Sequence, residues 1–143
     1  MKIIKYHSNS IEALESDYLY IQASQLKNAG NGLFTAINIY KHEIISLFKG
    51  EILSTIQAEL RASTGKDKYF INMVNGTIMD SMKVNCFAKY ANDAEGFLKS
   101  DFKNNADISL DEDGNVCLIA KRNIKSGLEI FCGYGKVYWK KHR

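Results

Sequence analysis

The apolar residues of this chain fall in many short runs, separated by polar and glycine-containing turns. Tyr18–Gln22 and Leu128–Cys132 each have the composition of a single strand, and Ile37–Leu53 is rich in Ile, Tyr and Phe and predicts one or two strands. The strands do not alternate with long helices, which disfavours a parallel βαβ sheet. The pattern therefore predicts a mainly β chain with short helices.

Two Xaa-Gly dipeptides predict β-hairpins. Asn75-Gly76 is the strongest short hairpin signal and predicts a type I′ turn, in which both central residues need positive φ. Asp113-Gly114 marks a second hairpin. The expected strand pairs are Tyr69–Val74 with Thr77–Asp80, and Ala106–Leu110 with Val116–Ala120.

One helix has a clear start signal. Ser54 and Gln57 have the spacing of a capping box, which predicts a helix over Thr55–Ala62 that closes near Gly65. Shorter helical segments are expected within Val84–Ala91 and Lys136–Arg143.

Composition narrows the class of protein. The 143 residues suggest one domain, and 45% hydrophobic with 24% charged residues is typical of a globular chain. The net charge of +3 by itself argues for no nucleic-acid partner. No apolar run is long enough for a signal-peptide core or a membrane span, so we expect an intracellular protein that is not secreted.

The metal-binding residues do not form a known pattern. The three cysteines contain no CxxC pair and the three histidines are scattered, so we expect neither a disulfide framework nor a metal site. The acidic run Asp111–Asn115 invites a calcium interpretation, but Val116 and Arg122 stand where an EF-hand loop needs Gly and Glu. A solvated hairpin tip explains this run better.

Several further motifs are weak when each is taken alone. Gly30-Asn31-Gly32 fits a plain turn, Asn92-Asp93 a helix-end cap, and Tyr138-Trp139 a core anchor. Their order along the chain is more informative. The ordered motifs are Gly30-Asn31-Gly32-Leu33-Phe34, Phe48-Lys49-Gly50-Glu51, Lys89-Tyr90-Ala91-Asn92-Asp93, Asn104-Asn105-Ala106 and Glu129-Ile130-Phe131-Cys132-Gly133-Tyr134-Gly135.

Together these motifs resemble the SET-domain protein lysine methyltransferases over roughly residues 18–139. The resemblance implies an α+β, mainly β fold: a SET-domain β-clip of several small curved sheets, with few short helices and a C-terminal pseudoknot. It implies one domain over residues 1–143, with residues 136–143 as a lid or tail. It also implies S-adenosyl-L-methionine as cofactor and methyl transfer to a lysine of a protein, a histone being one candidate.

The resemblance also implies roles for individual residues. Tyr134 matches the catalytic tyrosine at the end of the ELxxxY motif. The cofactor-binding positions by match are Ala29, Gly30, Asn31, Gly32, Asn92 and Asp93. The expected residues of the substrate channel and its lid are Phe48, Ile108, Cys132, Tyr138 and Trp139.

The chain departs from the family pattern at three of these positions. Phe48 replaces the Tyr of YxGE, Asp93 replaces the His of the NH pair, and Cys132 stands where many members carry an aromatic residue. No cysteine follows Cys132, so the zinc module that often closes the channel is absent from this sequence, and Tyr138-Trp139 is the candidate replacement.

Two alternatives remain open at this stage. The missing hydroxyl at Phe48 favours a SET-fold module that binds cofactor or peptide with little or no turnover. The other is an unrelated β-rich structural or interaction protein. The expected partner is a protein or peptide that carries a lysine, with no membrane and no direct nucleic-acid binding, and a homodimer could complete the peptide groove. We expect a cytoplasmic location in a bacterium, or a nuclear one for a eukaryotic or host-directed protein.

Overall fold

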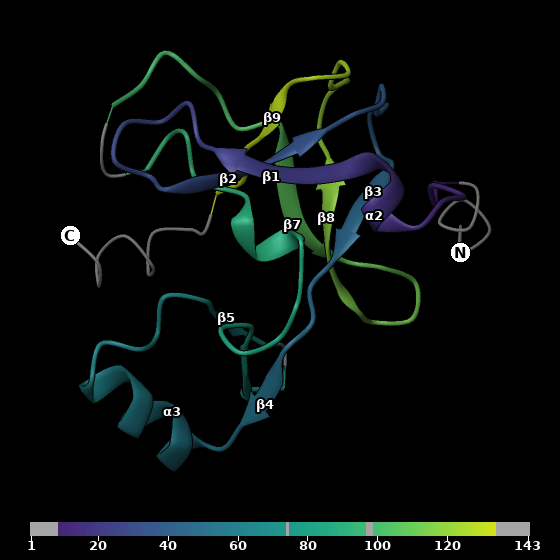
Figure 1. The fold of residues 1–143 in the computed structure, drawn as a ribbon. Coiled ribbons are helices and arrows are strands. Elements are labelled where there is room, and N and C mark those ends of the chain that lie inside the picture. Colours follow the sequence, from purple (N-terminus) through teal and green to yellow (C-terminus); the bar gives the residue numbers. More distant parts are fainter. Residues whose placement is uncertain (1–8, 74, 97–98, 134–143) are drawn as a thin grey trace.

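A computed structural model of the chain describes residues 9–73, 75–96 and 99–133, which form three small sheets and a few short helices (Figure 1). Each sheet has three strands, and neighbouring strands are antiparallel. The predicted mainly β class is confirmed. No helix in these residues is long and apolar enough to cross a membrane.

The first sheet joins the two ends of the described chain. Its order is β1 (Leu19–Ala23), β2 (Asn31–Thr35) and β9 (Glu129–Ile130), and the four-residue helix α2 (Glu15–Tyr18) leads into it. β1 begins one residue later than the predicted strand, because Tyr18 ends the helix. The Tyr18 hydroxyl donates a 2.6 Å hydrogen bond to the Ile45 carbonyl, which ties this sheet to the next.

The second sheet contains the predicted hairpin around Asp113-Gly114. It has the order β3 (Ile44–Leu47), β8 (Val116–Ala120) and β7 (Ala106–Leu110), and the last two strands have the predicted bounds. Gly114 has φ +82° at the hairpin tip, a conformation that costs glycine no steric penalty.

The third sheet has the order β4 (Glu51–Leu53), β6 (Ile78–Asp80) and β5 (Phe70–Asn72). The predicted hairpin is confirmed, but its predicted turn type is wrong. Asn72 pairs with Ile78, and Met73 N donates to the Thr77 carbonyl at 2.8 Å. The midpoint of this register is Asn75. A two-residue type I′ turn formed by Asn75 and Gly76 would instead have its midpoint between Asn75 and Gly76. Gly76, with φ +86°, is instead the left-handed residue at the end of a longer loop.

The helix between β4 and β5 confirms the capping box. Helix α3 (Thr55–Ser63) begins after Ser54, whose hydroxyl accepts from Gln57 N at 3.2 Å, while the Gln57 side chain accepts from Ser54 N at 2.9 Å. The helix ends before Gly65, which has φ +72°. A single 3₁₀ turn, η1 (Ala88–Tyr90), lies within the segment predicted to be helical.

The core lies in the part of the molecule that contains the first two sheets. Its largest fully buried apolar side chains are Leu33, Ile39, Ile45, Leu118, Ile124 and Ile130. Figure 1 shows β4, β5 and α3 set below this body, reached through the chain that follows β3. The predicted C-terminal helix at Lys136–Arg143, and the passage of the chain end under a loop, involve positions outside the described residues.

Candidate functional site

Segments from three of the ordered motifs meet at the end of the described chain. Phe131 forms a parallel bridge with Asn92, and Cys132 forms one with Ala106. Cys132 N donates to the Asn92 carbonyl at 2.9 Å, and Ala106 N donates to the Phe131 carbonyl at 3.0 Å. The chain that enters Gly133 and Tyr134 is therefore held between the Asn92 segment and the start of β7.

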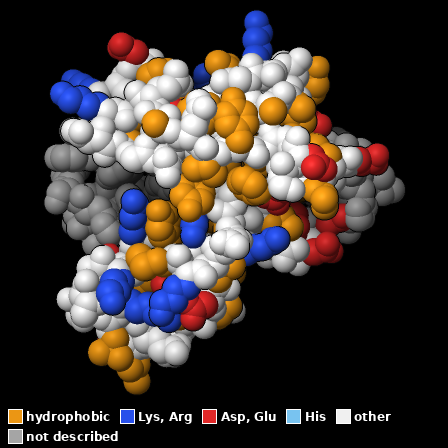
Figure 2. Space-filling view, in the orientation of Figure 1, with side chains coloured by type: hydrophobic (Ala, Val, Ile, Leu, Met, Phe, Trp, Pro, Cys, Tyr) orange, Lys and Arg blue, Asp and Glu red, His pale blue; other side chains and the backbone are white. Residues whose placement is uncertain are grey.

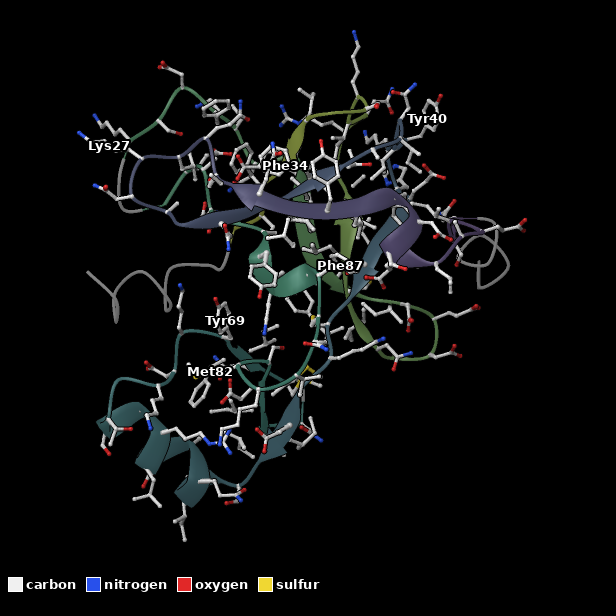
Figure 3. The ribbon with its side chains drawn as sticks, viewed as in Figure 1. Lys27, Phe34, Tyr40, Tyr69, Met82 and Phe87 are labelled. Atoms are coloured by element: carbon white, nitrogen blue, oxygen red, sulfur yellow. The ribbon has the colours of Figure 1, made fainter. Side chains whose placement is uncertain are left out.

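The Asn92 side chain adds a fourth segment to this meeting point. Its Nδ2 donates a 2.9 Å hydrogen bond to the Asn31 carbonyl in the GxG motif. Asn31 is the first residue of β2. The loop from β1 to this strand contains Lys27, which is labelled in Figure 3. The two motifs expected to bind the cofactor, Gly30–Gly32 and Asn92-Asp93, are thus side by side although they lie about sixty positions apart in the sequence.

The two glycines of the GxG motif have different surroundings. Gly30 has φ +68°, and a Cβ atom added there would meet nothing within 4 Å. Gly32 is buried, and a Cβ atom there would overlap the carboxylate of Glu129 and lie 3.2 Å from the Ser24 Cβ. The space on the Cβ side of Gly32 is therefore filled by the protein itself, and its expected role in cofactor binding stays a prediction.

Glu129, the first residue of the fifth motif, is a buried carboxylate to which the sequence analysis assigned no role of its own. It is 2% exposed; its Oε2 accepts from Ser24 Oγ at 2.6 Å and its Oε1 from Gln25 N at 2.8 Å. Ser24 N in turn donates to the Gly30 carbonyl at 2.8 Å. Glu129 therefore fixes the loop before the GxG motif. The available signal was an acidic residue placed inside an apolar strand.

Asp93, which replaces the family histidine, forms hydrogen bonds inside the protein. Its Oδ1 accepts from Asn104 Nδ2 and from Glu95 N, both at 2.9 Å. Asn104 also accepts from Ala94 N at 2.8 Å, so Asp93 and Asn104 brace the loop between them. A Cβ atom at Gly133 would lie 3.4 Å from Asn104 Nδ2, which places this pair beside the chain just before Tyr134.

A small pocket opens in the part of the molecule that contains the third sheet. Its walls are formed by Phe48, Tyr69, Phe70, Ile71, Ser81 and Lys89. Figure 3 shows the labelled Tyr69 and Met82 in this region, well apart from Phe34 on β2. Of the expected channel residues, Phe48 lines this pocket.

Lys89 is the cationic residue of the pocket wall, and its ammonium is held by the protein. Nζ donates to the carbonyls of Ser81 and Val84 at 3.1 Å, and it lies 5.4 Å from the ring centroids of Tyr69 and Tyr90. A cation over aromatic faces is an attractive arrangement. Lys89 thus ties the segment after β6 to η1 and keeps the Tyr69 ring against the pocket.

The acidic position of the second motif is part of an ion-pair network. Arg61 on α3 contacts Glu51 at 3.1 Å and the buried Asp80 at 2.7 Å. The hydrogen bond from Arg61 lowers the pKa of the Glu51 carboxyl below its usual value. This network joins α3 to the sheet beneath it, and sequence reasoning had assigned no role to Arg61.

The other expected site residues lie apart from this pocket or outside the described chain. Cys132 is fully buried in the core, and Ile108 on β7 packs against that core. Neither residue is among the side chains that line the pocket. Tyr134, Tyr138 and Trp139 lie outside the described residues. The channel assigned to Ile108, Cys132, Tyr138 and Trp139 stays a prediction.

The small antiparallel sheets, and the site at which the GxG, Asn92 and C-terminal segments meet, are the arrangement expected of a SET domain. In agreement with this, the family model described as SET domain matches residues 30–135, well over half of the chain. The chain belongs to the SET-domain family, whose members are generally protein lysine methyltransferases. A comparison with curated proteins found no match.

Proposed function

We propose that this protein transfers a methyl group from S-adenosyl-L-methionine to the side-chain amine of a lysine in a protein. The observation that supports this most directly is the hydrogen bond from Asn92 to Asn31, because it joins the two motifs that the family uses for its cofactor. Cys132, two residues before Tyr134 in the sequence, donates a hydrogen bond from its N–H to the Asn92 carbonyl.

The residues around Asn31 fit a cofactor held mainly through backbone groups. Gly30 and Asn31 are exposed, and the space next to Gly30 is open. When bound, S-adenosyl-L-methionine supplies a methyl group activated by a sulfonium centre. The positions proposed to hold it are Ala29, Gly30, Asn31, Gly32, Asn92 and Asp93, the last two through backbone atoms because Asn92 Nδ2 and Asp93 Oδ1 already have protein partners.

The protein's task in this reaction is to place a neutral amine in line with the methyl group. Free lysine has a pKa of ~10.4, so the amine must lose a proton before it can react. An apolar channel favours the neutral amine, and correct alignment of the reacting atoms supplies much of the rate. We propose that the Tyr134 hydroxyl orients the amine, and that Tyr138 and Trp139 close the channel lined by Phe48, Ile108 and Cys132.

A catalytically weak binding module is the second candidate, because Phe48 brings no hydroxyl to the pocket that it lines. Two measurements separate the candidates. Calorimetry with S-adenosyl-L-methionine tests the cofactor site, and incubation with radiolabelled cofactor and a whole-cell lysate tests turnover. Label in the lysine side chains of a protein is expected. Cofactor binding without any labelled protein would favour the binding module.

We further propose that residues 1–143 act as one domain inside a cell, with a lysine-containing protein as partner. A homodimer could complete the peptide groove. Size-exclusion chromatography with light scattering tests that proposal, and a single monomeric species at micromolar concentration would contradict it.

A further inference from the structure

The surface around the pocket carries an excess of lysine. Figure 2 shows blue Lys and Arg side chains gathered over the part of the molecule that Figure 1 labels α3, β4 and β5, with few red side chains between them. Four lysines between β3 and η1 are exposed, and we refer to them as the basic rim. They are Lys49, Lys66, Lys68 and Lys83.

Two residues of the basic rim, Lys49 and Lys68, contact residues of the pocket wall. Lys49 adjoins Phe48 in the chain, and its carbonyl accepts a 2.6 Å hydrogen bond from the Ser81 hydroxyl of the pocket wall. The Lys68 ammonium lies 5.2 Å from the ring centroid of Tyr69, another wall residue. Cationic groups within a Debye length of ~8 Å act together on an approaching charge.

Between Lys49 and Lys89, six basic residues face four carboxylates, so the region keeps an excess of two positive charges. Arg61 forms ion pairs with both Glu51 and Asp80. Asp67 lies between Lys66 and Lys68 in the chain but is buried, whereas Glu59 on α3 is exposed. Lys83 acts on Glu51 by contributing to its lowered pKa, and the other three rim lysines face solvent.

The edge of the third sheet favours a polypeptide as the ligand. Among the described strands, β5 pairs with β6 alone, and its residues Phe70 and Ile71 line the pocket. An extended peptide can add to such an edge through main-chain hydrogen bonds, which a nucleic acid cannot match. The pocket beside the edge includes Phe48, which we also propose for the lysine channel, so a peptide on this edge would lie next to the channel entrance.

We propose that the peptide accepted here carries acidic residues next to its target lysine. The inference rests on the proposed function and narrows its substrate class. Acidic flanks would pair with Lys49, Lys66 and Lys68, whereas a strongly basic segment of the histone-tail kind would be repelled by the same three charges. The cationic surroundings also favour the neutral form of the target amine, because nearby positive charge lowers the pKa of a lysine.

The test measures peptide affinity with the full chain. Three fluorescein-labelled peptides share one central lysine and differ in its flanks, which are Glu and Asp, Ser, or Arg and Lys. Fluorescence anisotropy is expected to give a Kd for the acidic peptide at least about tenfold below that of the basic one, since each exposed ion pair contributes modestly. Raising the salt concentration should shrink this difference.

Two matched double variants separate the basic rim from the general charge of the protein. Lys66→Glu with Lys68→Glu should abolish or reverse the preference for the acidic peptide. Thermal melts should stay near wild type because both residues are exposed. Lys41→Glu with Lys125→Glu changes the net charge equally on the turns beside the Ile39–Ile124 bridge, near the Tyr40 labelled in Figure 3, and should leave the preference unchanged.

Methyl transfer to the same peptides distinguishes the two proposals. Turnover with no preference for acidic flanks, or with a preference for basic ones, would overturn the inference and leave the proposed function standing. A rim-dependent preference for acidic peptides without methyl transfer to any would contradict the proposed function and support the inference. A short single-stranded oligonucleotide that binds the rim more tightly than the acidic peptide would overturn the choice of a peptide partner.

Discussion

The Glu129 carboxylate fills the space that a Cβ atom would occupy at Gly32. These residues belong to neighbouring strands, β2 and β9, that come from opposite ends of the chain. Glu129 uses both carboxylate oxygens to hold Ser24 and Gln25, so the glycine and the acid form one unit with the loop before the GxG motif. The second glycine of the motif is therefore required by packing inside the protein.

This relationship predicts that Gly32→Ala destabilises the fold. The added methyl group would displace a buried carboxylate from two hydrogen bonds, which costs about 3 kcal/mol or more in the free energy of unfolding. Urea denaturation followed by circular dichroism measures the loss. Calorimetry should show weaker cofactor binding only to the extent that the variant disturbs the loop around Ser24.

Gly30→Ala is the matched control for this prediction. No atom lies within 4 Å of its Cβ position, so the cost is limited to the left-handed backbone at φ +68°, roughly 1–2 kcal/mol. If both alanine variants lose the same stability, the contact between Gly32 and Glu129 is not what requires the glycine.

A second prediction concerns the hydrogen bond that joins the two expected cofactor motifs. Asn92→Asp keeps the shape of the side chain but replaces the Nδ2 donor with a carboxylate oxygen facing the Asn31 carbonyl. The Asn92 carbonyl still accepts from Cys132 N, so the fold should survive with a loss of about 1–2 kcal/mol. We expect cofactor affinity, measured by calorimetry, to fall about tenfold or more.

Asn123→Asp provides the comparison for that variant. Asn123 is exposed, and its Oδ1 accepts from Lys41 N at 2.9 Å, a role that an aspartate oxygen can keep. Its stability and cofactor affinity should match those of wild type. Equal cofactor affinity in Asn92→Asp and Asn123→Asp would separate the Asn92–Asn31 bond from cofactor binding.

The sequence predicted those parts of the fold that depend on local chemistry. Ser54 and Gln57 formed the expected capping box, because both partners lie within one helical turn. The strands around Asp113-Gly114 had the predicted bounds, since the turn and the apolar runs beside it agree. Asn75-Gly76 correctly predicted a hairpin but not its turn type, because the register is set by the pairing of β6 with both β5 and β4.

The long-range contacts of the site could not be predicted in the same way. The resemblance placed the Asn31 and Asn92 motifs at one cofactor site but did not predict the hydrogen bond between them, and the contact of Glu129 with Gly32 depends on pairing between strands distant in sequence. Lys89 reaches three carbonyls of the loop after β6, and no periodicity or motif signals such a contact. Buried polar side chains with distant partners are visible only once the fold is known.

A third prediction follows from the buried thiol of Cys117 on β8. Burial, aided by the Asp111 carboxylate, raises its pKa from 9.0 to about 11. Above pH 9 the unfolded chain loses this proton and the folded chain keeps it, so the unfolded state binds fewer protons and stability falls as pH rises. Urea denaturation between pH 8 and about pH 11 should show the fall, levelling off for this group near the upper limit.

Cys117→Ala isolates that contribution. The variant is less stable at every pH because it leaves a small cavity, but its stability should fall less between pH 9 and about pH 11. Burial also raises the pKa of Tyr18, which adds a further fall at higher pH in both proteins and cancels in the comparison. Parallel pH profiles for wild type and Cys117→Ala would exclude this assignment.

The fourth prediction concerns Tyr134, on which the proposed mechanism depends most. Tyr134→Phe keeps the ring and removes the hydroxyl oxygen that we propose to orient the substrate amine. Losing one oriented polar group at a transition state typically costs ~10²–10³ in rate, so kcat should fall by that order. The melting temperature should stay near wild type, and cofactor affinity should change little, because the Asn31 and Asn92 segments are intact.

Steady-state kinetics with a lysine peptide separates the roles that this hydroxyl could have. A fall in kcat and in kcat/KM together indicates an interaction made in the transition state, whereas a rise in KM alone indicates uniform binding of the substrate. Phe131→Leu is a suitable control for aromatic packing nearby, because Phe131 is buried against Phe102 with ring centroids 5.3 Å apart and carries no polar group. Turnover of Tyr134→Phe within about threefold of wild type, far from the loss expected of an oriented catalytic group, would show that Tyr134 is not the catalytic tyrosine.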